Sequence, residues 1–276
     1  MSAFFTLVRK QLVESRWFLG IVAAGLFGLS WLFVYAAGRI EAQQRRDFNV
    51  VGRVQRAGFV RMLGGRSSDF SSTSIELSFW RHPFIILMVL SWAIGRGSVA
   101  VAGEVERGTL DVIMSRPISR TTYLLSQVTV GVFGLFLLGA ALIVGNFAGT
   151  QYNLIDSPPG FLKLFRAATA LAALGFAVYG YALFFSSMDV VRWRANLIAS
   201  TLTIAMFIAQ IVANIPSLTN LAWLEHWSIF TAYDPVEAAL KGENLAFNAL
   251  VLGGIGLGSV CAALVAFRVR DLPSNS

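Results

Sequence analysis

The chain has 276 residues, of which 56% are hydrophobic and 13% are charged, and its formal net charge is +7. About 25% of the residues of an ordinary soluble domain are charged, so this composition excludes a soluble globular protein and indicates an integral membrane protein. The basic residues cluster between apolar runs, which favours loops facing anionic lipid and argues against binding to nucleic acid.

The first sixteen residues mix apolar and charged side chains at the spacing of a helix. We predict an amphipathic helix over residues 3–16 that lies in the membrane interface before the first span. The alternative is a simple extension of the first span beyond the membrane.

Six apolar runs follow along the chain, and each is long enough for a helix to cross the hydrocarbon core, which takes about 20 residues. They cover residues 17–37, 83–103, 122–149, 167–187, 195–215 and 245–267. Transmembrane strands would alternate in polarity, whereas these runs are continuously apolar. We therefore predict an all-α integral membrane protein with six transmembrane helices in a single membrane domain over residues 1–276.

Few polar side chains lie within these runs. Arg96 is their only charged residue, and it lies eight residues before Glu104, or about 12 Å along a helix. That distance puts its long side chain within reach of the nearer membrane surface, so Arg96 need not be a buried functional charge. The uncharged polar residues of the runs are expected to hydrogen-bond a neighbouring helix, with contact to a substrate as the alternative. They are Gln127, Asn146, Asn196, Gln210 and Asn214.

The distribution of lysine and arginine predicts the orientation of the spans. An even number of spans puts both termini on one side, and that side has ten basic residues: Arg9, Lys10, Arg16, Arg107, Arg116, Arg120, Arg192, Arg194, Arg268 and Arg270. Two loops on the other side contain only Lys163, Arg166 and Lys241, but the third, over residues 38–82, holds eight arginines and opposes this assignment. The role of that loop stays open. Because the N-terminal segment and every other loop agree, we expect both termini in the cytoplasm and the protein in the cytoplasmic (inner) membrane.

A polar segment, AGEVERGTLDVIMSRPISR over residues 102–120, separates the second span from the third. Gly108 can end one helix, and Thr109 can then cap a new helix of about two turns. Pro117 would end that short helix, and Ser119 can cap the span that follows. Such a helix is either a docking site for a soluble partner or a tight turn lying on the lipid headgroups, and the residues alone favour neither.

Within this segment, GEVERGTLDVIMSRPISRTTYLLSQ resembles the signature of ABC-2-type transporter permeases. The matching positions are Glu104, Gly108, Thr109, Leu110, Pro117, Ser119 and Arg120. VRKQLVESRW near the N-terminus is similar to the amphipathic helix of that family, and FTAYDPVEAALKGE is similar to its aromatic-Asp-Pro segment before the last span. In the latter, Asp234 and Pro235 also predict the start of a short helix. The resemblance covers essentially the whole chain.

The resemblance implies the membrane half of an ABC transporter that exports a substrate and works as a dimer with a second, identical or similar, permease copy. ATP and Mg²⁺ would bind to a separate ATPase subunit, so this chain would hold no cofactor, metal or catalytic site of its own. The residues agree, because a phosphate-binding loop needs Gly-Lys-Ser/Thr and none of the three lysines follows a glycine. The ATPase would contact a coupling helix over residues 109–116 and its flanks, namely Glu104, Glu106, Thr109, Leu110, Asp111, Ile113, Met114, Arg116 and Arg120.

Two other classes of membrane protein stay open. An ion-coupled secondary transporter usually keeps ionisable groups at mid-membrane, and five of the six spans have none. A non-transporting subunit that anchors or assembles other proteins would be distinguished by the absence of ATP-stimulated transport. No residue identifies the transported substrate.

Overall fold

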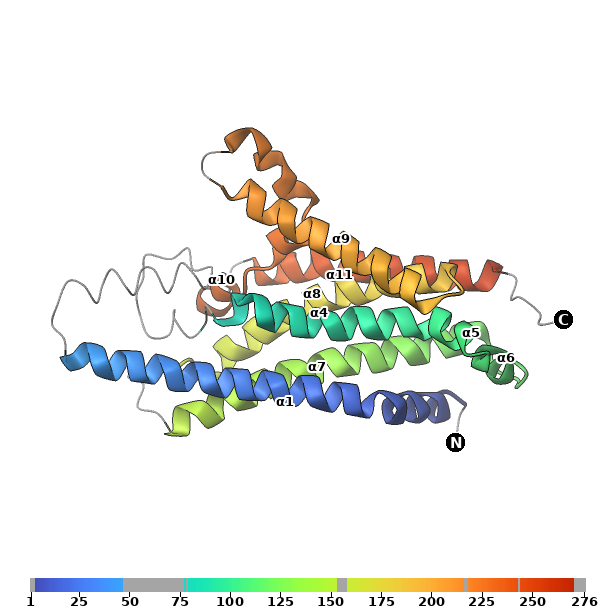
Figure 1. The fold of residues 1–276 in the computed structure, drawn as a ribbon, viewed down its shortest axis with the longest axis horizontal. Helices are drawn as coiled ribbons and strands as arrows, with labels where there is room; N and C mark the ends of the chain where they lie inside the picture. The colour runs from blue at the N-terminus through green and yellow to red at the C-terminus, as the bar shows by residue number, and fades with distance from the viewer. Residues whose placement is uncertain are drawn as a thin grey trace.

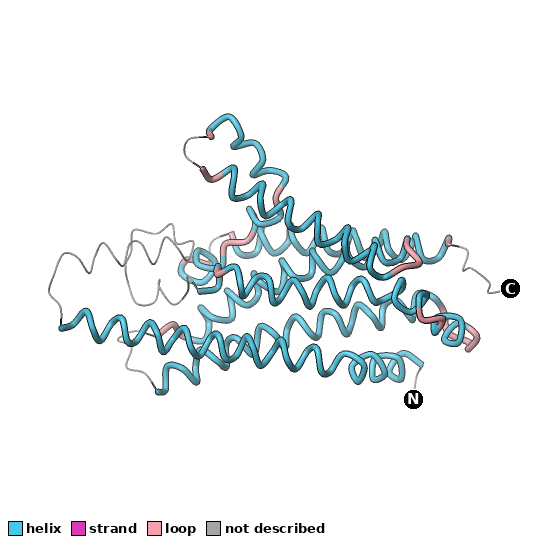
Figure 2. Tube along the Cα trace, in the orientation of Figure 1, coloured by secondary structure: helices cyan, strands magenta, loops and turns pink. Residues whose placement is uncertain are grey.

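The computed structural model describes residues 3–46, 77, 79–152, 158–215, 218–242 and 244–270. Within these residues the chain is a bundle of long helices without a strand (Figure 1, Figure 2). Six helices in this part of the chain are long and apolar enough to cross a membrane. The predicted all-α membrane fold is therefore confirmed.

The six long helices coincide with the six predicted apolar runs. They are α1 (Ala3–Arg46), α4 (Pro83–Ser98), α7 (Arg120–Tyr152), α8 (Phe161–Met188), α9 (Arg192–Ala213) and α11 (Leu245–Val269). A π-helical turn (Val99–Gly103) and α5 (Glu104–Glu106) continue α4, and α6 (Thr109–Met114) and α10 (Pro235–Leu240) are short separate helices. Short 3₁₀-helices cover Phe79–Arg81, Thr219–Trp227 and Ile229–Ala232.

The first helix differs from its prediction. α1 is one uninterrupted helix of 44 residues, or about 66 Å at 1.5 Å per residue, which is about twice the ~30 Å of the hydrocarbon core. It therefore extends beyond the hydrocarbon, and no break separates residues 3–16 from the first span. The structure thus gives an extension of the first span, and the interfacial position of residues 3–16 stays a prediction.

The loop predicted over residues 38–82 is described only in part. Its first residues belong to α1, which continues to Arg46. Residues 47–76, with Arg53, Arg56, Arg61 and Arg66 among them, lie outside the described residues. The predictions made for those residues lie outside them as well.

α4 and α8 form the centre of the bundle. In the most apolar stretch of each helix 67% of the residues are buried inside the protein, against 17% in α9 and 28% in α11. Glycine lets α8 approach its neighbours closely, as is common between membrane helices. A Cβ atom at Gly97 of α4 would lie 2.7 Å from the Cβ of Ala182, and one at Gly180 would lie 2.6 Å from the backbone oxygen of Gly256 in α11.

The two ends of the bundle are held by different contacts. The start of α1 and the end of α11 lie at the same end as α5 and α6 (Figure 1), which we call the termini end. At the opposite end, the far end, Arg81 forms an ion pair with Asp234, and the Tyr233 hydroxyl donates to the backbone oxygen of Trp80 at 2.6 Å. Asp234 also caps α10 by accepting from the Glu237 N–H at 2.9 Å, so the predicted helix start at Pro235 is confirmed.

Candidate functional site

The polar segment between α4 and α7 folds as a tight turn at the termini end. Gly108 precedes α6 with a φ of 68°, a left-handed conformation that favours glycine. Thr109 begins α6, but its hydroxyl does not cap that helix as predicted: it donates to the Glu104 carboxylate and, at 3.2 Å, to the Glu104 backbone oxygen. Ser119 does cap α7, because its hydroxyl accepts from the Thr122 N–H at 3.1 Å.

Glu104 is the central residue of this turn, and it is only 2% exposed. Its carboxylate accepts hydrogen bonds from Thr109 and, at 2.7 Å, from Nη2 of Arg107, and it lies 3.6 Å from Nζ of Lys10 in α1. A buried carboxylate is stable when cations and donors surround it, and removing one partner leaves an uncompensated charge. Glu104 therefore fixes α1, α5 and α6 to one another and does not face the solvent.

Glu106 connects the same turn to α9. It is exposed, and its Oε2 accepts from the backbone N–H of Arg192, the first residue of α9, at 3.0 Å. The N–H groups of a first helical turn have no partner within the helix, and a carboxylate there also interacts favourably with the helix dipole. A displacement of the turn would therefore act directly on the start of α9.

Arg120 makes its contacts within the chain. Its Nη1 donates to the backbone oxygens of Phe267, Arg268 and Arg270 at 2.8, 3.1 and 2.6 Å, and its guanidinium lies 5.6 Å from the centre of the Phe267 ring. The last carbonyl groups of a helix lack partners within it and attract cations. Arg120 therefore joins the start of α7 to the end of α11.

The predicted contact residues of α6 differ in exposure. Asp111 and Arg116 are exposed. Leu110 is 1% exposed and belongs to the hydrophobic core, while Ile113 and Met114 are partly buried against it. Leu110 thus anchors α6 to the bundle, and the charged residues at its two ends face outward.

An apolar surface accompanies these charges. Val112 lies between them in the sequence and is 64% exposed. A groove of about 590 Å³ runs between the start of α1 and α6, and Leu7, Val112 and Ile113 line part of it. The outer side of α6 therefore offers apolar surface flanked by an acid and a base.

Arg96 is buried, whereas the sequence allowed its side chain to extend toward the membrane surface. It is 6% exposed and stays inside the bundle, where Nη2 donates to Oε1 of Gln127 in α7 at 2.6 Å and to Oε1 of Gln11 in α1 at 3.4 Å. These amide oxygens accept hydrogen bonds from part of the guanidinium inside the bundle, where a polar group without a hydrogen-bond partner is costly. The same bond confirms that Gln127 joins neighbouring helices. Asn196 does not, since its Oδ1 accepts from Ser200 of its own helix at 3.3 Å.

The π-helical turn lies between Arg96 and Glu104 and was not expected from the sequence. Its wider winding leaves backbone groups that a side chain of α8 satisfies: Ser186 Oγ accepts from the N–H groups of Val101 and Ala102 at 3.1 and 2.9 Å and donates to the Ser98 oxygen at 2.8 Å. Such turns often occur at functional positions in helices. This one attaches the last part of α4 to α8 just before the Glu104 turn.

Comparison with known families decides the class of protein. The profile of ABC-2 family transporter proteins matches residues 9–272, which is nearly the whole chain. The chain belongs to the ABC-2 transporter family. A search of curated proteins found no match. This ABC-2 protein is therefore a multi-pass membrane protein and a transport subunit of the ABC permease type.

The signature segment of the ABC-2 protein is the turn around Glu104. Sequence reasoning located this segment but missed the residues that fasten it, Lys10, Ser186 and the backbone of Arg192. Nothing in a single sequence pairs residues of α1, α8 and α9 with a turn after α4. Among the described residues no group of three or more His, Cys, Asp or Glu could hold a metal ion, and the contacts of the turn fix positions of helices rather than orient reacting groups.

Proposed function

We propose that the ABC-2 protein is the membrane-spanning subunit of an exporter and that the α5–α6 turn receives the movement of a separate ATPase subunit. The observation that supports this is the attachment of one short turn to three long helices. Glu104 joins the turn to α1 through Lys10, the turn is continuous with α4, and Glu106 holds the start of α9. A force on α6 would therefore reach all three helices at once.

The surface for the ATPase is the outward side of the turn. Asp111, Val112 and Arg116 are exposed there, and charges beside an apolar side chain fix the register of a partner. Ile113 and Met114 complete the apolar part. In this proposal Glu104, Thr109, Leu110 and Arg120 keep the turn in shape and do not meet the partner themselves.

The remaining parts of the proposal follow from the family. The termini end would face the cytoplasm of the inner membrane, where ATP and Mg²⁺ would bind to the ATPase and not to this chain. A second permease copy, identical or similar, would complete the pathway.

The orientation is tested with Ser115→Cys in a chain whose Cys261 is replaced by alanine: an impermeant maleimide should label inverted vesicles and not intact cells. Labelling of intact cells would overturn the assignment.

Docking is tested by exchanging charges on α6. The full chain is purified together with its ATPase, and the pair Asp111→Arg with Arg116→Glu is expected to release the ATPase because both substitutions reverse exposed charges. Lys241→Glu is the matched control, since Lys241 is exposed at the far end, and it should retain the ATPase. Retention by the folded double variant would contradict docking on α6.

Transmission is tested separately from docking. Glu106→Ala removes the acceptor for the Arg192 N–H and is expected to keep the ATPase bound. Leu197 is an exposed residue of α9, and Leu197→Cys in the chain lacking Cys261 reports on the movement of that helix. ATP should change its labelling rate when Glu106 is present and should change it much less in Glu106→Ala. An equal response in both chains would show that the force reaches α9 by another route.

A proton-coupled secondary transporter is less well supported. Such a transporter needs a group that gains and loses a proton within the membrane, and arginine stays protonated in proteins, so Arg96 cannot serve. Glu104 is the only buried carboxylate among the described residues, and two cations surround it. The proposed exporter needs neither residue to titrate.

A further inference from the structure

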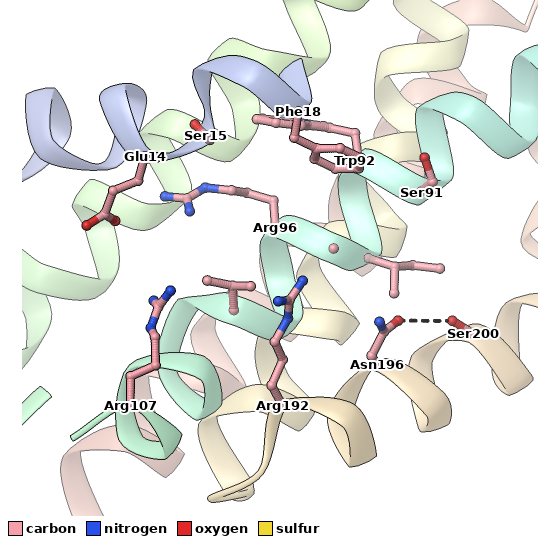
Figure 3. Close-up of a pocket in the computed structure, with 13 residues that line it drawn as sticks. Glu14, Ser15, Phe18, Ser91, Trp92, Arg96, Arg107, Arg192, Asn196 and Ser200 are labelled. Carbon is pink, nitrogen blue, oxygen red and sulfur yellow. Dashed lines mark hydrogen bonds between the residues drawn. The ribbon is translucent and has the colours of Figure 1, made fainter. Parts of the chain in front are cut away.

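A cavity of about 460 Å³ lies between α1, α4 and α9, apart from the outward side of α6 (Figure 3). Three arginines line it: Arg96 of α4, Arg107 of the turn and Arg192 of α9. Glu14 of α1 contributes the carboxylate of the lining. Figure 3 shows Arg107 and Arg192 directed toward the space beside Arg96 and Glu14. The cavity is therefore predominantly basic.

The ion pairs of the lining leave two of these arginines without a counter-ion. Arg107 pairs with Glu104 at 2.7 Å, and Glu14 pairs with Lys10 at 3.3 Å. In the part of the chain that the structure describes, no carboxylate lies within ion-pair distance of the guanidinium of Arg96 or of Arg192. Two positive charges from different helices thus face the cavity without a direct ion pair.

Arg96 gives the stronger indication of a ligand. It is 6% exposed, and its buried Nε has no hydrogen-bond partner among the described residues. Its Nη2 meets only the neutral amides of Gln11 and Gln127. A buried charge whose hydrogen bonds come from neutral groups is costly, and a guanidinium with an unused N–H can bind an anion through charge-assisted hydrogen bonds. The cavity therefore offers a prepared position for negative charge.

An apolar groove of about 240 Å³ continues from the cavity between α4 and α9. The two share Ser91, Ile94 and Ser200 in their linings. The groove continues along α4 toward Pro83, away from the arginines, and Phe207 is among the apolar residues that line it. The two adjoining spaces thus give this region a cationic end and a hydrocarbon-lined end.

We propose that this region binds a phosphate-bearing amphiphile, with its headgroup at Arg96 and Arg192 and its hydrocarbon chain between α4 and α9. A tetrahedral phosphate presents oxygens in several directions, so guanidinium groups from two helices can bind it together, with the side-chain amide N–H of Asn196 as a further donor. The apolar groove would hold the hydrocarbon chain of the amphiphile, and a free phosphate ion has no such chain. The idea that the amphiphile is the exported cargo rests on the proposed exporter function. The binding of the amphiphile does not.

Binding is measured on the full chain purified in nonionic detergent. Phosphatidic acid is titrated and the bound lipid is counted by native mass spectrometry, with phosphatidylcholine of the same chain length as the second probe. Phosphatidic acid should bind more tightly than phosphatidylcholine, and Arg192→Gln should weaken its binding about tenfold, as expected for the loss of a charge-assisted hydrogen bond. Equal binding of the two lipids would overturn the proposal.

A matched control lies two residues further along α9. Arg194 is exposed and stacks on the neighbouring Trp193, and it does not line the cavity. Arg194→Gln removes the same charge from the same helix end and should leave binding of phosphatidic acid unchanged. If both variants lose binding equally, the lipid interacts with surface charge alone and the site is refuted. Arg96→Gln should also weaken binding, and because this variant can fail to fold, the exposed Arg192 decides the result.

Further measurements distinguish a lipid headgroup from free phosphate and test lipid binding independently of the exporter function. Inorganic phosphate or glycerol phosphate, added at the same concentration as the lipid, should not displace phosphatidic acid. Displacement would show a site for free phosphate and would overturn the proposal of an amphiphile. Ile204→Asn, in the apolar groove, should weaken binding of the lipid. No ATP or ATPase is present, so the variant Asp111→Arg with Arg116→Glu should still bind phosphatidic acid. Failure of the exporter proposal therefore leaves this result untouched, and the reverse also holds.

Discussion

α8 and α9 follow each other in the chain and are both apolar enough to span a membrane, but they are placed very differently. In their most apolar stretches 67% of the residues of α8 and 17% of those of α9 are buried inside the protein. α8 packs against α4, α7 and α11, whereas the buried residues of α9 are Ala195, Ala199 and Thr203. Because lipid tails are as apolar as a protein interior, hydropathy alone cannot distinguish a central helix from a peripheral one.

The difference lies in small residues and in where each helix is attached. Glycine and alanine along α8 allow backbones to approach, as at Gly180. α9 instead exposes branched side chains such as Ile204 and Ile208. Single hydrogen bonds attach its start to Glu106 and its middle, through Thr203, to Tyr181 of α8. Its second half is bonded to Ser228 and Thr231, which follow it in the chain. We expect α8 to be the fixed frame of the bundle and α9 the helix that moves against it.

The largest effect is expected from Gly180→Ala in α8. The new Cβ would lie 2.6 Å from the backbone oxygen of Gly256 and 3.0 Å from its Cα, and backbone atoms cannot rotate away. Overpacking costs about 1–3 kcal/mol and occasionally more. Because the contact here is with backbone, we expect at least the upper end of that range, and Tm in detergent should fall markedly. Gly254→Ala is the control, because a Cβ there meets no atom within 4 Å. Equal Tm values for the two variants would contradict the close contact of α8 with α11.

Gln127→Leu should have the next largest effect. It removes the nearest acceptor of the buried Arg96 and should destabilise the protein by about 2–3 kcal/mol, since a buried charged donor loses its partner. Asn196→Leu is the comparison on α9, where the amide bonds only within its own helix, and a change within about 0.5 kcal/mol is expected. Thermal unfolding followed by tryptophan fluorescence measures both. A larger loss from Asn196→Leu would reverse the proposed roles of the two helices.

Much of the fold could be predicted because its main signals are local. Each span needs an uninterrupted apolar run, and Ser119 and Pro235 mark helix starts within a few residues of the N–H groups that they affect. The α5–α6 turn was located in the same way, from Gly108 and Pro117. These features depend on chain neighbours, which one sequence contains.

The features that the sequence could not provide depend on contacts between distant segments. Arg96 is buried because α1 and α7 bring amide oxygens to it, and the π-helical turn is satisfied by Ser186, which lies 85 residues from Val101. Glu104 and Arg120 share a motif with exposed residues, yet they bind other parts of the same chain. A motif gives the identity of a residue and not the direction of its side chain.

A smaller effect is expected from Thr203→Val, which removes the side-chain bond between α8 and α9. The buried Tyr181 hydroxyl would lose its partner, at a cost of about 1 kcal/mol. Hydrogen exchange should become faster in α9 and stay unchanged in α8. Thr129→Val is the matched control, because the exposed Thr129 hydroxyl bonds only the Leu125 oxygen of its own helix, at 2.9 Å. Faster exchange in both helices would show that they open together and not separately.

The smallest effect on the isolated chain should come from Ile208→Ala. This side chain is 53% exposed, so its truncation should change stability by less than about 0.5 kcal/mol. Because Ile208→Ala hardly changes the stability of the monomer, it can also test whether α9 lies in a dimer interface. If a second permease copy covers α9, Ile208→Ala should lower the dimer fraction on dilution while the Tm of the monomer stays the same. Lipid alone against α9 would leave the dimer fraction unchanged, because hydrocarbon replaces the lost methyl groups equally well.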